Sequence, residues 1–227
     1  MTMPLISSTD PELFDTALMQ SIESQNFSSN GLKSLHISGF RGQASNLRSM
    51  IAIAGAYESL ERFSFVCPLE SVSLLTLKRQ DSNPKYSEDI VECLSTSIAP
   101  GQLKHLCLWS WSASYRSQLL HLLRRSSTLS NLQSIACSAN DLTEELIFAL
   151  PSTLTRILIC THTAYSPLRI EETVQALLER GRNSGLREVV LYDPGADSCE
   201  GAGIAWEPLM RSRIKVTISS RADILYQ

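Results

Sequence analysis

A short pattern of apolar residues recurs along this 227-residue chain and constrains its fold more than any other feature. The pattern places apolar side chains at positions 1, 4 and 6 of a six-residue segment. Clear copies begin at Leu32, Leu60, Leu103, Leu132, Leu154 and Leu186, and a weaker copy begins at Arg213. Successive first positions lie 22 to 32 residues apart, except for a gap of 43 residues between Leu60 and Leu103. A repeat of this period predicts one structural unit that is used many times.

The segments between the copies have the apolar spacing of one-sided helices. This spacing predicts helices over residues 45–59, 87–98, 114–125, 143–150, 170–182 and 203–211. A short strand and a one-sided helix cannot bury their apolar faces alone, whereas stacked units bury them against each other. We therefore predict an α/β fold, with a parallel sheet on one side and helices on the other.

The chain divides into three parts on this interpretation. Asp10 and Pro11 are typical of a helix start and predict an N-terminal helix within residues 1–30, which would cap the first unit. Residues 31–219 form a domain of about six to seven units, and residues 220–227 form a C-terminal tail. This tail is a poor cap for the last unit. We therefore expect either a homodimer through the uncapped end or a longer natural chain.

The repeated segments resemble leucine-rich repeats, whose core pattern is LxxLxLxxNxL. The copy from Leu132 to Leu142 matches every consensus position, including Asn140. The resemblance implies that the Asn140 side chain bonds to adjacent backbone. The other copies depart at this position, where they have Phe40, Pro68, Trp111, His162 and Pro194.

This family resemblance implies a solenoid, or horseshoe, with the sheet on its concave side and the helices on its convex side. The long units are similar to the ribonuclease-inhibitor-like subtype, and their irregular spacing is similar to the divergent repeats of F-box proteins. Residues 1–30 are too short to hold an F-box, so no F-box is recognisable. The resemblance therefore implies protein binding, with substrate recognition in a ubiquitin ligase as the more specific hypothesis.

The charge balance and hydropathy exclude several classes of protein. The chain has 20 basic and 23 acidic residues, and a dedicated nucleic-acid binder usually has a basic excess. No apolar run is long enough to span a bilayer, and the first ten residues do not resemble a secretory signal. We therefore expect no nucleic-acid partner, no membrane partner, and a cytoplasmic or nuclear location.

The sequence positions of the cysteines and carboxylates give little indication of a catalytic site. The six cysteines include no CxxC pair, so we expect free thiols and neither a metal nor another cofactor. Cys160 and His162 could form a nucleophile and base, but no orienting carboxylate is close in the sequence. The pairs Glu144-Glu145 and Glu171-Glu172 fall in the first turns of predicted helices, where the helix dipole favours them.

The residues that point away from the helices are the best candidates for a contact surface. If positions 1, 4 and 6 face the core, positions 3, 5 and 7 face the concave side of the sheet. Arg, Trp and Tyr are the residue types that most often anchor protein interfaces. We therefore expect a protein partner at Arg62, His105, Trp109, Trp111, Arg156 and Tyr192. Both tryptophans could instead cover core between neighbouring units.

Two other functions stay open at this point. The strand–helix alternation could belong to an α/β enzyme with a pocket at the carboxyl ends of its strands. The strands favour a solenoid, because central strands of such enzymes are continuously apolar, whereas these alternate apolar and polar residues. A structural repeat fragment of a larger protein is the other alternative.

Overall fold

The computed structural model describes most of the repeated region. Its described residues are 33–38, 48–52, 59–67, 92–110, 116–125, 129–160, 167–192 and 206–219. The predicted N-terminal helix in residues 1–30 and the tail in residues 220–227 lie outside them, as does the first position of the first copy, Leu32.

The protein has an α/β fold in which a seven-stranded parallel sheet alternates with helices. The strands are β1 (Ser34–Ser38), β2 (Arg62–Cys67), β3 (His105–Ser110), β4 (Ser134–Ser138), β5 (Arg156–Cys160), β6 (Glu188–Tyr192) and β7 (Lys215–Ser219). Each strand pairs with the next one along the chain, so the order is β1-β2-β3-β4-β5-β6-β7. The first and last strands do not pair, and the sheet is open.

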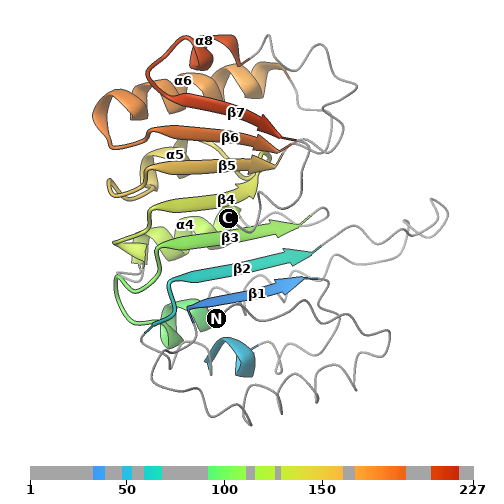
Figure 1. The fold of residues 1–227 in the computed structure, drawn as a ribbon, viewed down its shortest axis with the longest axis vertical. Coiled ribbons are helices and arrows are strands. Elements are labelled where there is room, and N and C mark those ends of the chain that lie inside the picture. The colour runs from blue at the N-terminus through green and yellow to red at the C-terminus, as the bar shows by residue number, and fades with distance from the viewer. Residues whose placement is uncertain are drawn as a thin grey trace, which may run out of the picture.

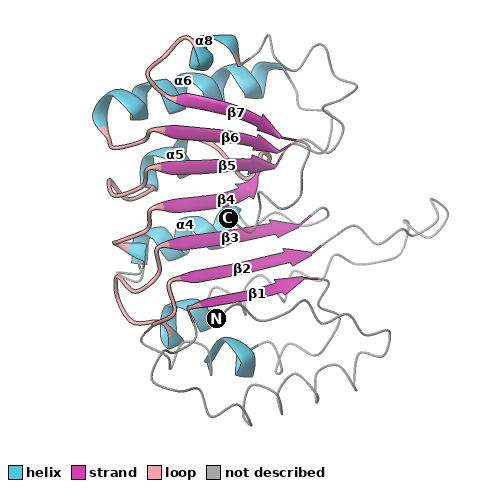
Figure 2. Cartoon of the chain, viewed as in Figure 1, coloured by secondary structure: helices cyan, strands magenta, loops and turns pink. Residues whose placement is uncertain are grey.

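Helices connect successive strands. They are α4 (Arg116–Arg125), α5 (Glu144–Ala149), α6 (Pro167–Asn183) and α8 (Glu207–Met210), and residues 48–52 and 92–97 are also helical. Helices α4, α5 and α6 all lie behind the sheet in Figures 1 and 2. The predicted alternation is confirmed, although α8 is only four residues long and has Pro208 near its start.

The strand pairing is in register with the repeat. Position 4 of each copy lies beside position 4 of the next, so Leu35, Phe63 and Leu106 form the beginning of a row that ends at Val216. A second row runs from Ile37 through position 6 of every strand. Alternation along a strand turns both rows to the same face.

The main hydrophobic core lies between these two rows and the helices. Leu106, Ile135, Ile157 and Val189 are at most 2% exposed. The described first positions of the clear copies are also buried, as predicted: Leu60, Leu103, Leu132, Leu154 and Leu186. Burying each side chain of this size contributes about 1.5–3 kcal/mol to the free energy of folding.

The seventh copy is the weak one in the structure as well as in the sequence. Arg213 at its first position is exposed, and Ile214 beside it is buried instead. Ile218, which lies in the row that is buried in the preceding strands, is 45% exposed at the edge of the sheet. The repeat therefore becomes less complete at β7.

Helix α5 begins with a side-chain cap. The Thr143 hydroxyl accepts a hydrogen bond from the Leu146 amide at 3.3 Å, and Glu144 and Glu145 lie in the first turn, as predicted. The matching prediction for Glu171 and Glu172 is wrong. Helix α6 begins at Pro167 rather than at residue 170, so its first turn has no acidic residue.

An arginine from the neighbouring helix donates hydrogen bonds to the backbone carbonyls at the end of α5. Arg180 of α6 is only 6% exposed, and its guanidinium donates to the carbonyls of Ile147 (2.9 Å), Leu150 (2.9 Å) and Pro151 (2.6 Å). The last carbonyls of a helix have no partner within the helix. Arg180 therefore ties α5 to α6 and supplies the cation that the last turn of α5 lacks.

The resemblance-based expectation for Asn140 is wrong. Asn140 is exposed, and its backbone amide donates to the Ser138 hydroxyl at 3.3 Å. The neighbouring Asp141 is buried instead. The turn after β4 therefore does not place an asparagine side chain inside the stack.

Replacing Arg180 with methionine tests the link between α5 and α6. Arg180→Met keeps the length of the side chain but leaves buried carbonyls without donors, so we expect the free energy of unfolding to fall by about 3 kcal/mol. Urea denaturation measures this loss. Arg182→Met is the matched control, because Arg182 is exposed on the same helix, and it should change stability by less than about 0.5 kcal/mol. Equal losses in the two variants would contradict the assigned role.

Candidate functional site

The face of the sheet that turns away from the helices carries a continuous row of polar side chains. Position 3 of every copy is the first residue of its strand, and these residues pair in register across the whole sheet. The row reads Ser34, Arg62, His105, Ser134, Arg156, Glu188 and Lys215. The repeat predicts that these residues share one face, and the register confirms it.

The rest of this face is buried between β3 and β6. Cys107, Ala136, Leu158, Cys160, Val190 and Tyr192 form a second apolar cluster, separate from the main core. Tyr192 is 6% exposed and Cys160 is fully buried. Position 5 of β3 to β6 and position 7 of β5 and β6 therefore pack as a small second core.

The accessible part of the face lies where the strands begin. Arg62 and Lys215 are exposed, whereas His105, Arg156 and Glu188 are half-buried. We call the first residue of each strand, together with the residue before it, the strand-start strip. Its members are Lys33, Ser34, Glu61, Arg62, Lys104, His105, Gln133, Ser134, Thr155, Arg156, Arg187, Glu188 and Lys215; Ile214 is left out because it is buried in the main core.

The backbone of the strip is the same in successive units. The Glu61 and Arg62 amides both donate to the Lys33 carbonyl, and the Lys104 and His105 amides both donate to the Glu61 carbonyl. The same two-to-one pattern continues through β6. Because these backbone amides are already bonded, side chains are the groups that the strip offers to a ligand.

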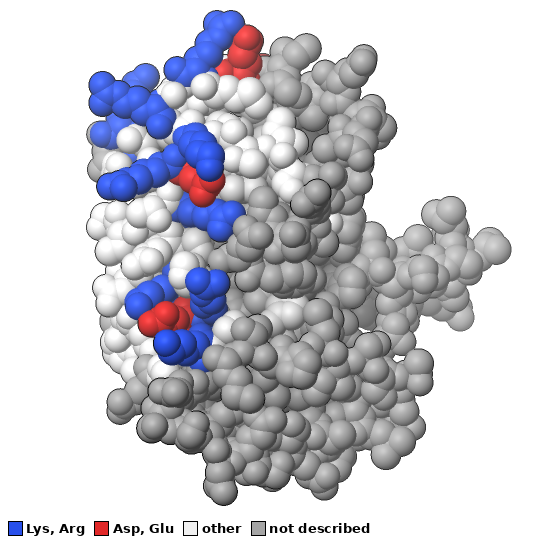
Figure 3. Space-filling view, viewed as in Figure 1, with Lys and Arg blue, Asp and Glu red and all other residues white. Residues whose placement is uncertain are grey.

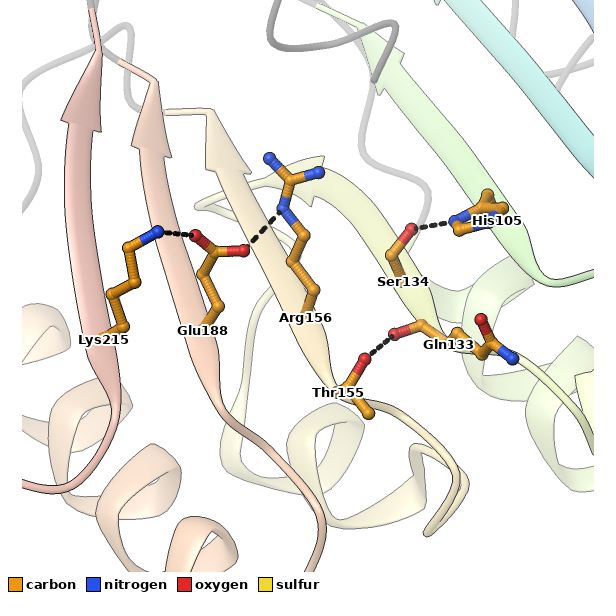
Figure 4. Close-up of polar contacts among 7 residues, drawn as sticks. All are labelled: His105, Gln133, Ser134, Thr155, Arg156, Glu188 and Lys215. Atoms are coloured by element: carbon orange, nitrogen blue, oxygen red, sulfur yellow. Dashed lines mark hydrogen bonds and ion pairs between the residues drawn. The ribbon is translucent and has the colours of Figure 1, made fainter.

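An ion-pair ladder joins the last three strands (Figure 4). The Lys215 Nζ lies 2.9 Å from Glu188 Oε1, and the Arg156 Nε lies 3.2 Å from Glu188 Oε2. Glu188 therefore stands between two cations on neighbouring strands. Opposite charges on adjacent strands stabilise a sheet modestly.

His105 and Ser134 form the next contact in the same row. The His105 Nδ1 lies 2.7 Å from the Ser134 Oγ (Figure 4). Burial, together with the nearby Arg62 guanidinium, lowers the pKa of His105, so the imidazole is neutral at pH 7. Activation of serine also needs a third group that orients the base. Within the described part of the chain, no carboxylate accepts a hydrogen bond from this imidazole, and the pair fits a polar contact between strands.

A second ion pair lies near the other end of the strip. The Lys104 Nζ donates to Glu61 Oε1 at 2.8 Å, and this hydrogen bond lowers the pKa of the Glu61 carboxyl. Both side chains are about 40% exposed, so solvent screens the pair and it adds little stability.

The structure brings together three of the six predicted contact residues. Arg62, His105 and Arg156 share the position-3 row on β2, β3 and β5. Tyr192 does not belong with them, because its side chain is buried in the second apolar cluster. Trp109 lies on β3, but its side chain and the whole of Trp111 lie outside the described residues.

The partners of these residues, Glu188 and Lys215, are not among the six residues predicted from the sequence. Both lie at position 3 of their copies, and Lys215 belongs to the weak seventh copy. The available signal was the alternation of charge at position 3, which reads Arg156, Glu188, Lys215 in consecutive units.

Catalysis by the described cysteines has no support in this structure. Cys93, Cys107, Cys137 and Cys160 are buried free thiols. Burial raises the pKa of Cys107 to about 11 and raises the pKa of Cys160 further, so both disfavour the reactive thiolate. His162, the base considered for Cys160, lies outside the described residues. Among the residues that the structure describes, no group of three or more His, Cys, Asp or Glu side chains could hold a metal ion.

Comparison with known proteins adds no family. No protein-family model matches the chain, and no curated protein and no solved structure is significantly similar to it. In the described ranges, no helix has the length and apolar character needed to cross a membrane.

The half-buried histidines predict how stability depends on pH. The pKa values of His36 and His105 are lowered from 6.5 by burial, so the unfolded chain takes up protons before the folded protein does. Stability should therefore be constant above about pH 7.5 and fall as the pH drops below about 6.5. The double variant His36→Gln, His105→Gln should flatten this dependence in thermal melts between about pH 5.5 and 7.5, where most carboxylates stay ionised.

His121→Gln is the matched control for this experiment. His121 is exposed on α4, on the other side of the sheet, and its replacement should leave the pH dependence as in the unmodified protein. An unchanged slope in the double variant would contradict the role of His36 and His105.

Proposed function

We propose that this protein is a non-catalytic scaffold of the leucine-rich-repeat type, which binds a protein partner through the face of its sheet opposite to helices α4, α5 and α6. The sequential strand order and the in-register rows support a horseshoe-like solenoid. The more specific version is substrate recognition resembling the repeats of F-box proteins, in the cytoplasm or nucleus.

One observation carries this proposal. The strand-start strip keeps charged and polar side chains accessible on all seven strands, although the same face is buried further along β3 to β6. Exposed ion pairs contribute little to stability, so folding alone does not require these charges. Arginine is also among the residue types that most often dominate binding energy at interfaces.

An α/β enzyme is the weaker alternative. Open-sheet enzymes bind their ligands where the strand order reverses, beside the carboxyl ends of the strands. Across β1 to β7 the order has no reversal. A structural repeat fragment of a larger protein would keep the same stacking but would not need an accessible charged strip.

The proposal is tested by comparing captured partners across matched variants. We expect affinity purification with mass spectrometry to lose specific partners when Arg62→Ala and Arg156→Ala are combined. The control combines Arg124→Ala and Arg182→Ala on the helical side, which removes the same charge and also breaks one ion pair, Arg124 to Glu145. The control protein should still capture the partners that the Arg62→Ala, Arg156→Ala variant loses.

Two outcomes would count against the proposed surface. An identical set of partners in all three proteins would place binding elsewhere, and loss in both variants would indicate a general charge effect. Circular dichroism and thermal melting confirm that each variant is folded before the comparison.

The open end of the sheet supports a homodimer as a second element of the proposal. Ile218 lies in the row that is buried in the preceding strands, yet on β7 it is 45% exposed. A second copy of the chain could cover this apolar side chain. We expect Ile218→Lys to convert a dimer to a monomer in size-exclusion chromatography with light scattering, whereas Lys215→Ala, on the same strand, should leave the dimer intact. A monomer in the unmodified protein would overturn this element.

A further inference from the structure

The strand-start strip has a charge opposite to that of the chain as a whole. It holds six cations and two carboxylates, a net charge of +4, in a protein whose net charge is −3. The lowered pKa of His105 keeps that residue neutral at pH 7. Figure 3 shows lysine and arginine side chains gathered along the side of the sheet where the strands begin, with few carboxylates among them.

The charges of the strip fall into two groups. Over β1 to β3 they are Lys33, Glu61, Arg62 and Lys104, and over β5 to β7 they are Arg156, Arg187, Glu188 and Lys215. Each group has a net charge of +2. Between them, β4 contributes only Gln133 and Ser134, which are uncharged.

The parallel sheet sets the distance between these two groups. Adjacent strands lie about 4.8 Å apart, so the centres of the groups, at β2 and β6, are about 19 Å apart. An extended peptide advances about 3.3 Å per residue. Two acidic clusters about six residues apart would therefore meet both cationic groups at once.

We propose that the partner segment bound here is an acidic peptide with two carboxylate clusters spaced by about six residues. This inference rests on the proposed protein-binding function and names the chemistry of the partner. The arginine forks of Arg62 and Arg156 suit planar carboxylates, which they can bind through two parallel hydrogen bonds.

A peptide fits the strip better than a nucleic acid does. Nucleic acids carry a phosphate on every nucleotide, so phosphates would fall against Glu61 and Glu188 as well as against the cations. A peptide can place uncharged residues at those two points and across Gln133. The overall acidic balance of the chain also disfavours a polyanion that covers a wider surface.

Two synthetic peptides of identical composition test the spacing. The spaced probe is Glu-Glu-Gly-Ser-Gly-Ser-Glu-Glu, and the contiguous probe is Gly-Ser-Glu-Glu-Glu-Glu-Gly-Ser, each labelled for fluorescence anisotropy with the full chain at low salt. We expect the spaced peptide to bind about fivefold more tightly, because only it reaches both groups, and its affinity to fall with added salt.

Variants of the protein test the assigned residues. Combining Arg62→Ala with Arg156→Ala should weaken binding of the spaced peptide about tenfold. Each of the two cationic groups then loses one charge-assisted contact with the peptide. The Arg124→Ala, Arg182→Ala control should bind as the unmodified protein does. Glu188→Gln should strengthen binding, because it removes the carboxylate that competes for Arg156 and Lys215.

The outcomes separate this inference from the function on which it rests. Equal affinity for both peptides, or no binding of either, overturns the acidic-peptide proposal; if partner capture still depends on Arg62 and Arg156, the scaffold function stands without it. An oligothymidylate of eight nucleotides that binds more tightly than the spaced peptide at the same salt would assign the strip to nucleic acid and also overturn the proposal.

Discussion

The parallel register pairs each strand of the sheet with the same positions of the next strand. Position 4 meets position 4 from Leu35 to Val216, and position 3 meets position 3 from Ser34 to Lys215. Because side chains alternate between faces, a slip of one residue in any strand would turn its apolar row away from the helices and its polar row into the core. The register therefore determines both the core and the accessible strip.

The helices share the main core with this sheet, and individual contacts also join one helix to the next. Helix α5 is short and has no basic residue in its last turn, so its carbonyls depend on Arg180 from α6. At the next residue of α6, a Cβ on Gly181 would lie 2.6 Å from the Ile214 Cδ1, so an alanine there would require the Ile214 side chain to move. A glycine within a helix costs about 1 kcal/mol of stability relative to alanine.

The repeat predicted the described strands and most of the helices because apolar spacing reports which side of an element is covered. It could not predict that Tyr192 and Cys160 would be buried, since both lie on the face that a simple one-sided sheet leaves open. Burial there depends on what packs over the face, which no strand period encodes. For the same reason, the matching consensus position at Asn140 did not predict its exposure, because the turn geometry depends on neighbouring units.

The charges in the position-3 row follow a rule that the register imposes. Residues at this position are nearest neighbours across the sheet, so like charges on adjacent strands would repel each other. Neutral His105 and Ser134 separate Arg62 from Arg156, and Glu188 separates Arg156 from Lys215. Sheet stability explains why like charges are kept apart, although a row of uncharged serine and threonine would avoid repulsion equally well.

Sheet stability does not explain why cations outnumber carboxylates in the strand-start strip of an acidic chain. Such an excess leaves a positive potential along one side of the sheet, and a negatively charged partner is the ligand that would gain most from it.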